Sequence, residues 1–139
     1  MSAMRVLLVE DDEDHVFLIR RAMSELVDVP VGVQVASNGE DAVSLLEAAS
    51  SGQATRPDLV VLDLRLPKLG GLDVLRTIRA NPSLAKTPLV VLTSSEDPDD
   101  HARARALGAD DSICKPLDGA SLRVQVQSLV RRWRVPPTP

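Results

Sequence analysis

The sequence has almost no capacity for disulfide bonds. Its 139 residues include a single cysteine, Cys114, so no internal disulfide can form. Disulfides persist in oxidising compartments, whereas a lone thiol suits a reducing one. We therefore expect a cytoplasmic protein.

Long apolar runs and an excess of positive charge are also missing. No stretch approaches the ~18 consecutive apolar residues of a membrane-spanning helix, and the first residues lead into an apolar run without a signal-peptide pattern. The net charge is −4, with acids concentrated at residues 10–14 and 96–100, which argues against binding to nucleic-acid phosphates. We expect neither a membrane segment nor a nucleic-acid partner.

The chain leaves no room for a second domain and has no internal repeats. With 139 residues, of which 44% are hydrophobic, it has the size and composition of one globular domain. The last residues are rich in proline. The sequence therefore predicts one domain over residues 1–133 and a Pro-rich tail over residues 134–139.

The sequence does contain several short apolar runs, each of which stops at a polar residue. Runs of this length, rich in β-branched residues and separated by helical stretches, are typical of the buried strands of a parallel sheet. The runs are residues 6–9, followed by Glu10, Asp11 and Asp12; residues 59–62, followed by Asp63; residues 89–92, followed by Thr93; and residues 112–114, followed by Lys115.

Another strand and several helices complete the predicted fold. The alternation of Val31, Val33 and Val35 with Gly and Gln predicts a half-buried strand near a sheet edge. Apolar residues at helical spacing predict helices, including one over residues 13–27, while residues 97–107 have few apolar side chains and should pack thinly. Strand and helix alternate five times, which predicts an α/β fold with a doubly wound five-stranded parallel sheet in the order 2-1-3-4-5.

The polar residues that follow these strands should meet at one place. The carboxyl ends of parallel strands share one edge of the sheet, and the switch point of this order opens a crevice between Asp11 and Asp63. Asp63 follows a wholly apolar run, where a carboxylate costs several kcal/mol unless it is paired or metal-bound. Acids, a hydroxyl and an ammonium in one crevice predict a site for Mg²⁺ and a phosphoryl group.

These segments resemble the receiver domain of two-component response regulators over about residues 4–133. The resemblance rests on four motifs in order and adds a flavodoxin-like fold to the expectations above. Several segments, among them residues 64–68 and Asn81-Pro82, further resemble small regulators that partner bacterial phytochromes. The motifs are Val9-Glu10-Asp11-Asp12, Leu62-Asp63-Leu64-Arg65-Leu66-Pro67 with Gly70-Gly71, Val91-Leu92-Thr93-Ser94, and Cys114-Lys115-Pro116.

The resemblance implies that Asp63 accepts a phosphoryl group from a phosphohistidine on a sensor histidine kinase. Mg²⁺ would take oxygen ligands from Asp11, Asp63 and the backbone carbonyl of Arg65, and Glu10 would hold one of its waters. The catalytic set would be Asp63, Thr93 and Lys115.

In that set, Lys115 would give a phosphoryl oxygen a fixed positive charge, and Thr93 would donate its hydroxyl to another. The family pattern also implies a cis peptide before Pro116. We expect Ser94 or Ser95, rather than Thr93, to cap the next helix. The histidines His15 and His101 lie in polar helix starts and should be solvated.

The chain departs from the family at two places. Ser112 stands where many receivers carry the aromatic ring that turns inward on phosphorylation, so ring flipping cannot be the switch here. Arg65 and Ser95 would flank the path of the water that hydrolyses the phosphoryl group, and an arginine there could hinder or redirect that water.

Three functions fit this pattern to different degrees. The leading one is a stand-alone binding module switched by phosphorylation, not an enzyme. Its output would use helix four, strand five and helix five, whose apolar stripe ending at Trp133 suggests a homodimer. A phosphatase or phosphomutase would need an acid where Arg65 stands. A receiver-like scaffold not regulated by phosphorylation would not need the complete set of site residues.

Overall fold

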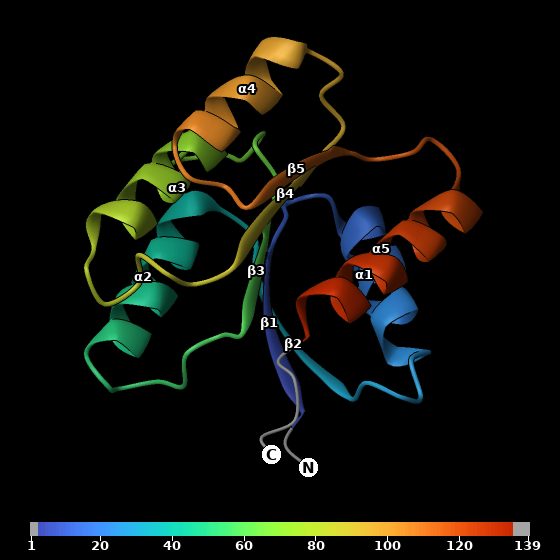
Figure 1. Cartoon of the computed structure of the whole chain (residues 1–139), viewed down its shortest axis with the longest axis horizontal. Helices are drawn as coiled ribbons and strands as arrows, with labels where there is room; N and C mark the ends of the chain where they lie inside the picture. The colour runs from blue at the N-terminus through green and yellow to red at the C-terminus, as the bar shows by residue number, and fades with distance from the viewer. Residues whose placement is uncertain (1–2, 135–139) are drawn as a thin grey trace.

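The computed structural model describes residues 3–134 and consists of alternating strands and helices (Figure 1). The Pro-rich tail predicted from the sequence lies, apart from Arg134, outside the described residues. The elements in order are β1 (Met4–Val9), α1 (Glu13–Ser24), β2 (Val31–Ala36), α2 (Gly39–Ser50), β3 (Leu59–Leu62), α3 (Gly71–Ala80), β4 (Leu89–Thr93), α4 (Pro98–Ala106), β5 (Asp111–Cys114) and α5 (Gly119–Trp133).

The strands form one five-stranded sheet in the order β2-β1-β3-β4-β5, and every pair is parallel. This confirms the predicted fold. The register places the last residues of β1, β2 and β3 side by side, with Val9 opposite both Ala36 and Leu62, and pairs Thr93 of β4 with Cys114 of β5. The residues that follow these strands therefore start from neighbouring points on one edge of the sheet.

Helices cover both faces of the sheet (Figure 1). Helices α1 and α5 pack on one face, and α2, α3 and α4 lie on the other, so that one apolar cluster forms on each face of the sheet. The side chains of β3 and β4 are buried throughout, as expected for central strands covered on both faces. Strand β2 lies at the edge and is only half-buried, as its alternating pattern predicted.

Helix α4 packs thinly, as its composition predicted. Its one buried residue is Ala104, which contributes a single methyl group to the core. Asp97 caps the helix, with its side chain accepting a hydrogen bond from the Asp99 amide, and Pro98 occupies the first turn. The expectation that Ser94 or Ser95 caps α4 is therefore wrong, because the helix begins only at Pro98 and its cap is Asp97.

Helix α5 does not present a free apolar stripe. Its residues Leu122, Val126, Leu129 and Val130 are all buried in the cluster shared with α1, and Trp133 packs, partly buried, against the same cluster. The sequence argument for a dimer took this stripe as surplus, which is wrong, because α5 uses it to cover the sheet together with α1.

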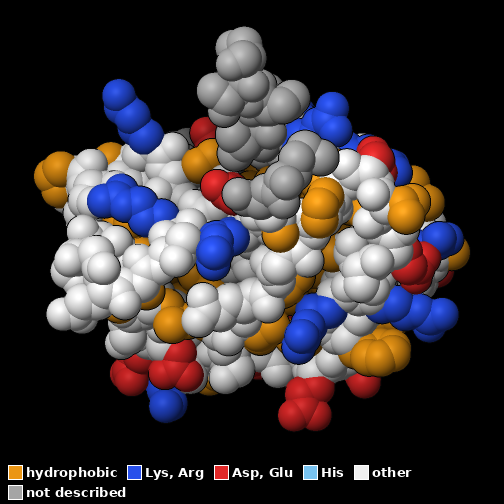
Figure 2. Space-filling model, turned by 90° about the horizontal axis from the view of Figure 1, so that it is seen from below, with side chains coloured by type: hydrophobic (Ala, Val, Ile, Leu, Met, Phe, Trp, Pro, Cys, Tyr) orange, Lys and Arg blue, Asp and Glu red, His pale blue; other side chains and the backbone are white. Residues whose placement is uncertain are grey.

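The end of the molecule where the strands begin shows basic and acidic side chains interspersed (Figure 2). No broad area of one sign gathers on this face. Among the described residues, no helix combines the length and apolar character that crossing a membrane requires.

Candidate functional site

Glu10 and Asp11 extend β1 into the predicted crevice. The Glu10 amide donates to the carbonyl of Ala36 at 3.0 Å, which prolongs the ladder to β2 by one residue. The Glu10 side chain is buried, with 2% of the residue exposed, whereas Asp11 is exposed. Carboxylate oxygens of Glu10, Asp11 and Asp63 lie within 4.8 Å of one another. The structure therefore brings together the three acids that the sequence placed there.

Asp63 is held at the end of β3 by its own backbone. Its amide donates to the Val9 carbonyl at 2.9 Å, and its Oδ1 accepts from the Arg65 amide at 3.1 Å. Helix α3 starts directly against this turn, since the Gly71 amide donates to the Leu64 carbonyl. A side chain at position 71 would collide with the Asp63 carbonyl oxygen, so only glycine lets α3 begin this close to the end of β3.

Lys115 enters the site from the end of β5. Its amide donates to the Thr93 carbonyl at 2.7 Å, and its side chain is only 2% exposed. The ammonium donates to Glu10 Oε1, to Asp63 Oδ2 at 3.1 Å, and to His15 Nδ1 at 2.9 Å. The Lys115–Pro116 peptide is trans, so the expected cis bond is wrong.

The two buried carboxylates differ in their pKa values. Burial raises the pKa of Glu10 to about 7, and the nearby Asp63 carboxylate adds to the rise, which the hydrogen bond from Lys115 only partly opposes. Burial also disfavours the charged form of Asp63. There, however, the Lys115 ammonium and the hydrogen bonds from Glu10, the Arg65 amide and Thr93 bring the pKa below its usual value. At neutral pH, Asp63 is therefore the ionised carboxylate of this pair.

Thr93 is fully buried at the end of β4, beside this cluster. Its Oγ1 accepts a long hydrogen bond of 3.4 Å from the Ser95 amide. Ser95 is also fully buried, and its hydroxyl donates to Asp100 Oδ2 at 2.5 Å. The loop between β4 and α4 is thus linked to the first turn of α4 by polar contacts.

The two histidines are not simply solvated, contrary to the expectation from the sequence. His15 is partly exposed but turns Nδ1 toward Lys115. His101 bridges the β4–α4 loop and β5, with Nε2 at 2.8 Å from the Ser95 carbonyl oxygen and Nδ1 at 2.5 Å from Ser112 Oγ. His15 lies three residues after the helix-capping Asp12, so the helix start could have suggested its place, but no local signal pairs His101 with Ser112.

The donor set fits Mg²⁺. The candidate ligands are oxygen atoms, which this hard cation prefers, and they come from crowded carboxylates. Burial is the main cause of the raised pKa of Glu10, and the Asp63 carboxylate adds to it; a divalent cation would offset that neighbouring negative charge. Arg65 lies two residues after Asp63, and its side chain is exposed.

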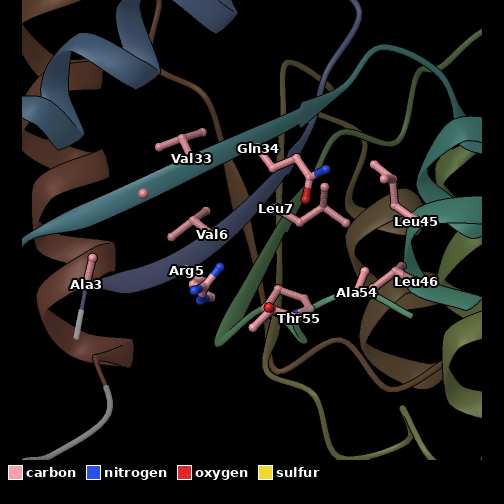
Figure 3. Close-up of a pocket in the computed structure, with 12 residues that line it drawn as sticks. Ala3, Arg5, Val6, Leu7, Val33, Gln34, Leu45, Leu46, Ala54 and Thr55 are labelled. Carbon is pink, nitrogen blue, oxygen red and sulfur yellow. The ribbon is translucent and has the colours of Figure 1, made fainter. Parts of the chain in front are cut away.

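A hollow with a different lining lies elsewhere in the described part of the chain. A groove of about 560 Å³ opens near the start of β1 and β2 (Figure 3) and is lined by residues such as Arg5, Gln34, Leu46 and Thr55. Its lining contains no carboxylate, histidine or cysteine. This groove therefore lacks the acidic groups that characterise the site at the carboxyl ends of the strands.

Comparison with known proteins agrees with this geometry. Residues 6–127 match the family model of the response regulator receiver domain, and the chain belongs to this family. A probable methanogenesis regulatory protein, FilR2 of Methanothrix harundinacea, is 35% identical over 128 residues, which cover 92% of this chain and 82% of that protein. Several other curated relatives are longer, and the chain spans about half of their length.

Two solved structures of response regulators are similar to this chain. One is a phytochrome response regulator, and the other is a metal-bound form. The phosphorylated cyanobacterial phytochrome response regulator RcpA has 32% identity and a TM-score of 0.89, with 95% of this chain and 94% of that chain covered. The Mn²⁺-bound response regulator Rcp1 has 30% identity and a TM-score of 0.86, with 94% of each chain covered. The chain is a receiver domain with a flavodoxin-like fold, as the sequence predicted.

Proposed function

We propose that Asp63 accepts a phosphoryl group and that Asp63, Thr93 and Lys115 form the reacting set. The observation that carries this proposal is the pairing of Asp63 Oδ2 with the buried Lys115 ammonium at 3.1 Å, while its other oxygen is held by a backbone amide. This arrangement keeps the carboxylate ionised and fixes its direction. Thr93, fully buried beside it, supplies a hydroxyl for a phosphoryl oxygen.

Glu10, Asp11, Asp63 and the Arg65 carbonyl would hold Mg²⁺, with Glu10 acting through a water. When bound, the metal would neutralise the charge that develops on the transferred phosphoryl group. The closeness of the three carboxylates supports this assignment, and the similar regulator Rcp1 is a Mn²⁺-bound form. The chain's own contribution is position and charge, as phosphoryl transfer generally requires.

Asp63→Asn is expected to abolish phosphorylation by acetyl phosphate, because an amide is not a nucleophile for phosphorus. The intact mass of wild type and variant, measured after treatment with acetyl phosphate and Mg²⁺, shows what fraction of each protein is phosphorylated. Asp12→Asn is the matched control, since Asp12 caps α1 and is absent from the proposed set. Full labelling of Asp63→Asn would refute the assignment.

The phosphodonor in the cell would be a sensor histidine kinase. We further propose that the chain works in the cytoplasm and has no catalytic activity toward other substrates. The single free cysteine suits a reducing compartment. The likeness to RcpA also makes a phytochrome-type kinase the first donor to test.

The conformational change caused by phosphorylation would pass from the site to α4 through the β4–α4 loop. If Thr93 turns toward a phosphoryl oxygen, the Ser95 amide loses its hydrogen-bond acceptor. The carbonyl of the same Ser95 is in hydrogen-bond contact with His101. His101 links that movement to Ser112 in β5, where the family's usual aromatic is missing. Because α4 buries little else than Ala104, such polar contacts fix its position.

His101→Ala is therefore expected to loosen α4 before any phosphorylation. Hydrogen exchange of the amides of residues 95–106 should become about fivefold faster, which corresponds to the ~1 kcal/mol typical of a hydrogen bond. Exchange in α1 serves as the internal control. If α4 exchanges at the wild-type rate in the variant, His101 does not link the loop to β5.

A homodimer through α4, β5 and α5 remains part of the proposal, but on a different basis from the apolar stripe. The charged residues Arg105, Asp111 and Arg132 form ion pairs across these elements and offer a polar surface to a second copy. Light scattering at high micromolar concentration, with and without beryllofluoride, decides the question. A monomer in every state would refute dimerisation.

A further inference from the structure

We propose that His15 positions Lys115 for phosphoryl transfer by accepting the third hydrogen bond of its ammonium. This inference rests on the proposed function, because it concerns how the reacting lysine is held. A lysine ammonium has three N–H donors and no lone pair. Around Lys115, the three acceptors are Glu10 Oε1, Asp63 Oδ2 and His15 Nδ1, so each donor has one partner.

The contact fixes the state of the imidazole. Because an ammonium can only donate, Nδ1 of His15 must accept, and the ring is neutral with its hydrogen on Nε2. The backbone of His15 is held in turn, since its amide and that of Asp14 both donate to the Asp12 side chain at the start of α1. The ring therefore stands at a fixed place on the rim of the site, 3.6 Å from Glu10 Oε1 and 3.8 Å from Asp12 Oδ2.

The three hydrogen bonds of Lys115 are not equal. Those to Glu10 and Asp63 join opposite charges, whereas the one to His15 has a neutral acceptor and is the weakest of the three. When a phosphoryl group reaches Asp63, one donor must turn to a phosphoryl oxygen. The bond to His15 is the one released, because breaking it separates no ion pair.

His15 thereby keeps one lysine donor at the open side of the site. The other two acceptors are almost fully buried, but the His15 side chain is 31% exposed and borders the solvent from which a phosphodonor arrives. Without His15, the ammonium would be drawn wholly onto the two buried carboxylates. His15 is thus a positioning residue that acts through Lys115.

The first test is the initial rate of phosphorylation by acetyl phosphate. His15→Ala should slow labelling of Asp63 about tenfold, equivalent to about 1.4 kcal/mol in the barrier. His15→Asn should restore most of the rate, because its Oδ1 is bonded to Cγ as Nδ1 is, whereas the longer His15→Gln should not. Phe17→Ala is the control on the same helix, since Phe17 is 62% exposed and is not one of the hydrogen-bond partners of the Lys115 ammonium.

The second test does not depend on a rate. The chain has two histidines, so ¹⁵N spectra of wild type and His15→Asn assign both rings. The Nδ1 resonance of His15 should indicate an unprotonated, hydrogen-bonded nitrogen, and it should shift in Lys115→Ala and again when beryllofluoride and Mg²⁺ are added to wild type. An unchanged Nδ1 resonance in both samples would overturn the inference.

The outcomes separate this inference from the proposed function. Wild type that is never labelled on Asp63 would refute both. Wild type that is labelled, together with His15→Ala labelled at the same rate, would overturn only the role of His15. Slowing by His15→Ala that Asn does not rescue would show a structural effect and would also overturn it.

Discussion

Lys115→Ala is expected to tighten Mg²⁺ binding about tenfold, or by about 1.4 kcal/mol. The buried ammonium contacts Glu10 and Asp63, two of the carboxylates that would hold the metal, and so competes with it. Its removal should also destabilise the metal-free protein by about 3 kcal/mol, since it leaves buried acids without a counter-ion. Calorimetric titration with Mg²⁺ at about pH 8, above the Glu10 pKa of about 7, measures the change in Mg²⁺ affinity.

Lys86→Ala provides the matched control, because Lys86 is exposed and follows α3, away from the carboxylate cluster. It should leave both Mg²⁺ affinity and stability unchanged. Weaker Mg²⁺ binding by Lys115→Ala than by wild type would contradict the account, because it would mean that the ammonium does not compete with the metal.

The metal-free protein is expected to lose stability as the pH rises from about 4.5 to about 7. The pKa of Glu10 is raised from 4.5 to about 7, so in this window the folded state keeps a proton that the unfolded state has lost. Stability from this group is fully present below pH 4.5 and is lost by about pH 7. The difference of about 2.5 in pKa corresponds to about 3 kcal/mol.

Asp63 has the opposite linkage in a different window. Its pKa is lowered below 3.8, so its contribution is present above that pH and is lost as the pH falls further. Urea unfolding at several pH values in EDTA tests the prediction, with Glu10→Gln as the comparison. The decline between pH 4.5 and 7 should nearly vanish in that variant; an equal decline in both proteins would show that Glu10 is not its source.

The sheet and the acidic site could be predicted because their signals are local. Each buried strand is a short apolar run, and the residue that follows it is fixed at the sheet edge by the ladder itself. Asp63 and Lys115, 52 residues apart, meet because β3 and β5 end on the same side of the sheet. Strand order and end residues were enough to place Glu10, Asp11, Asp63, Thr93 and Lys115.

The histidine contacts could not be predicted, because they depend on how helices dock against the sheet edge. His101 reaches Ser112 only because α4 lies beside β5, and neither residue carries a motif of its own. The role of the α5 stripe was misjudged for a similar reason. Periodicity showed an apolar face, but only packing against α1 shows that Leu122 and Val126 are already covered.

Helix ends also depended on contacts outside the local pattern. The apolar periodicity favoured a first helix reaching Val27, yet α1 ends at Ser24 and Val27 is almost fully exposed. The turn that follows α1 instead buries Leu26 and Val29 against the cluster shared with α5. Tertiary packing, rather than helical propensity, decides where this helix stops.

The most direct test of the central claim is to locate the acyl phosphate by chemistry. Borohydride reduces an aspartyl phosphate to homoserine, so protein treated with acetyl phosphate and Mg²⁺ can be reduced, digested and read by peptide mass. The account predicts homoserine in place of Asp63 alone, and none when EDTA replaces Mg²⁺. Reduction at Asp11, Asp12 or any other acid instead, or labelling of Asp63 that persists in EDTA, would contradict it.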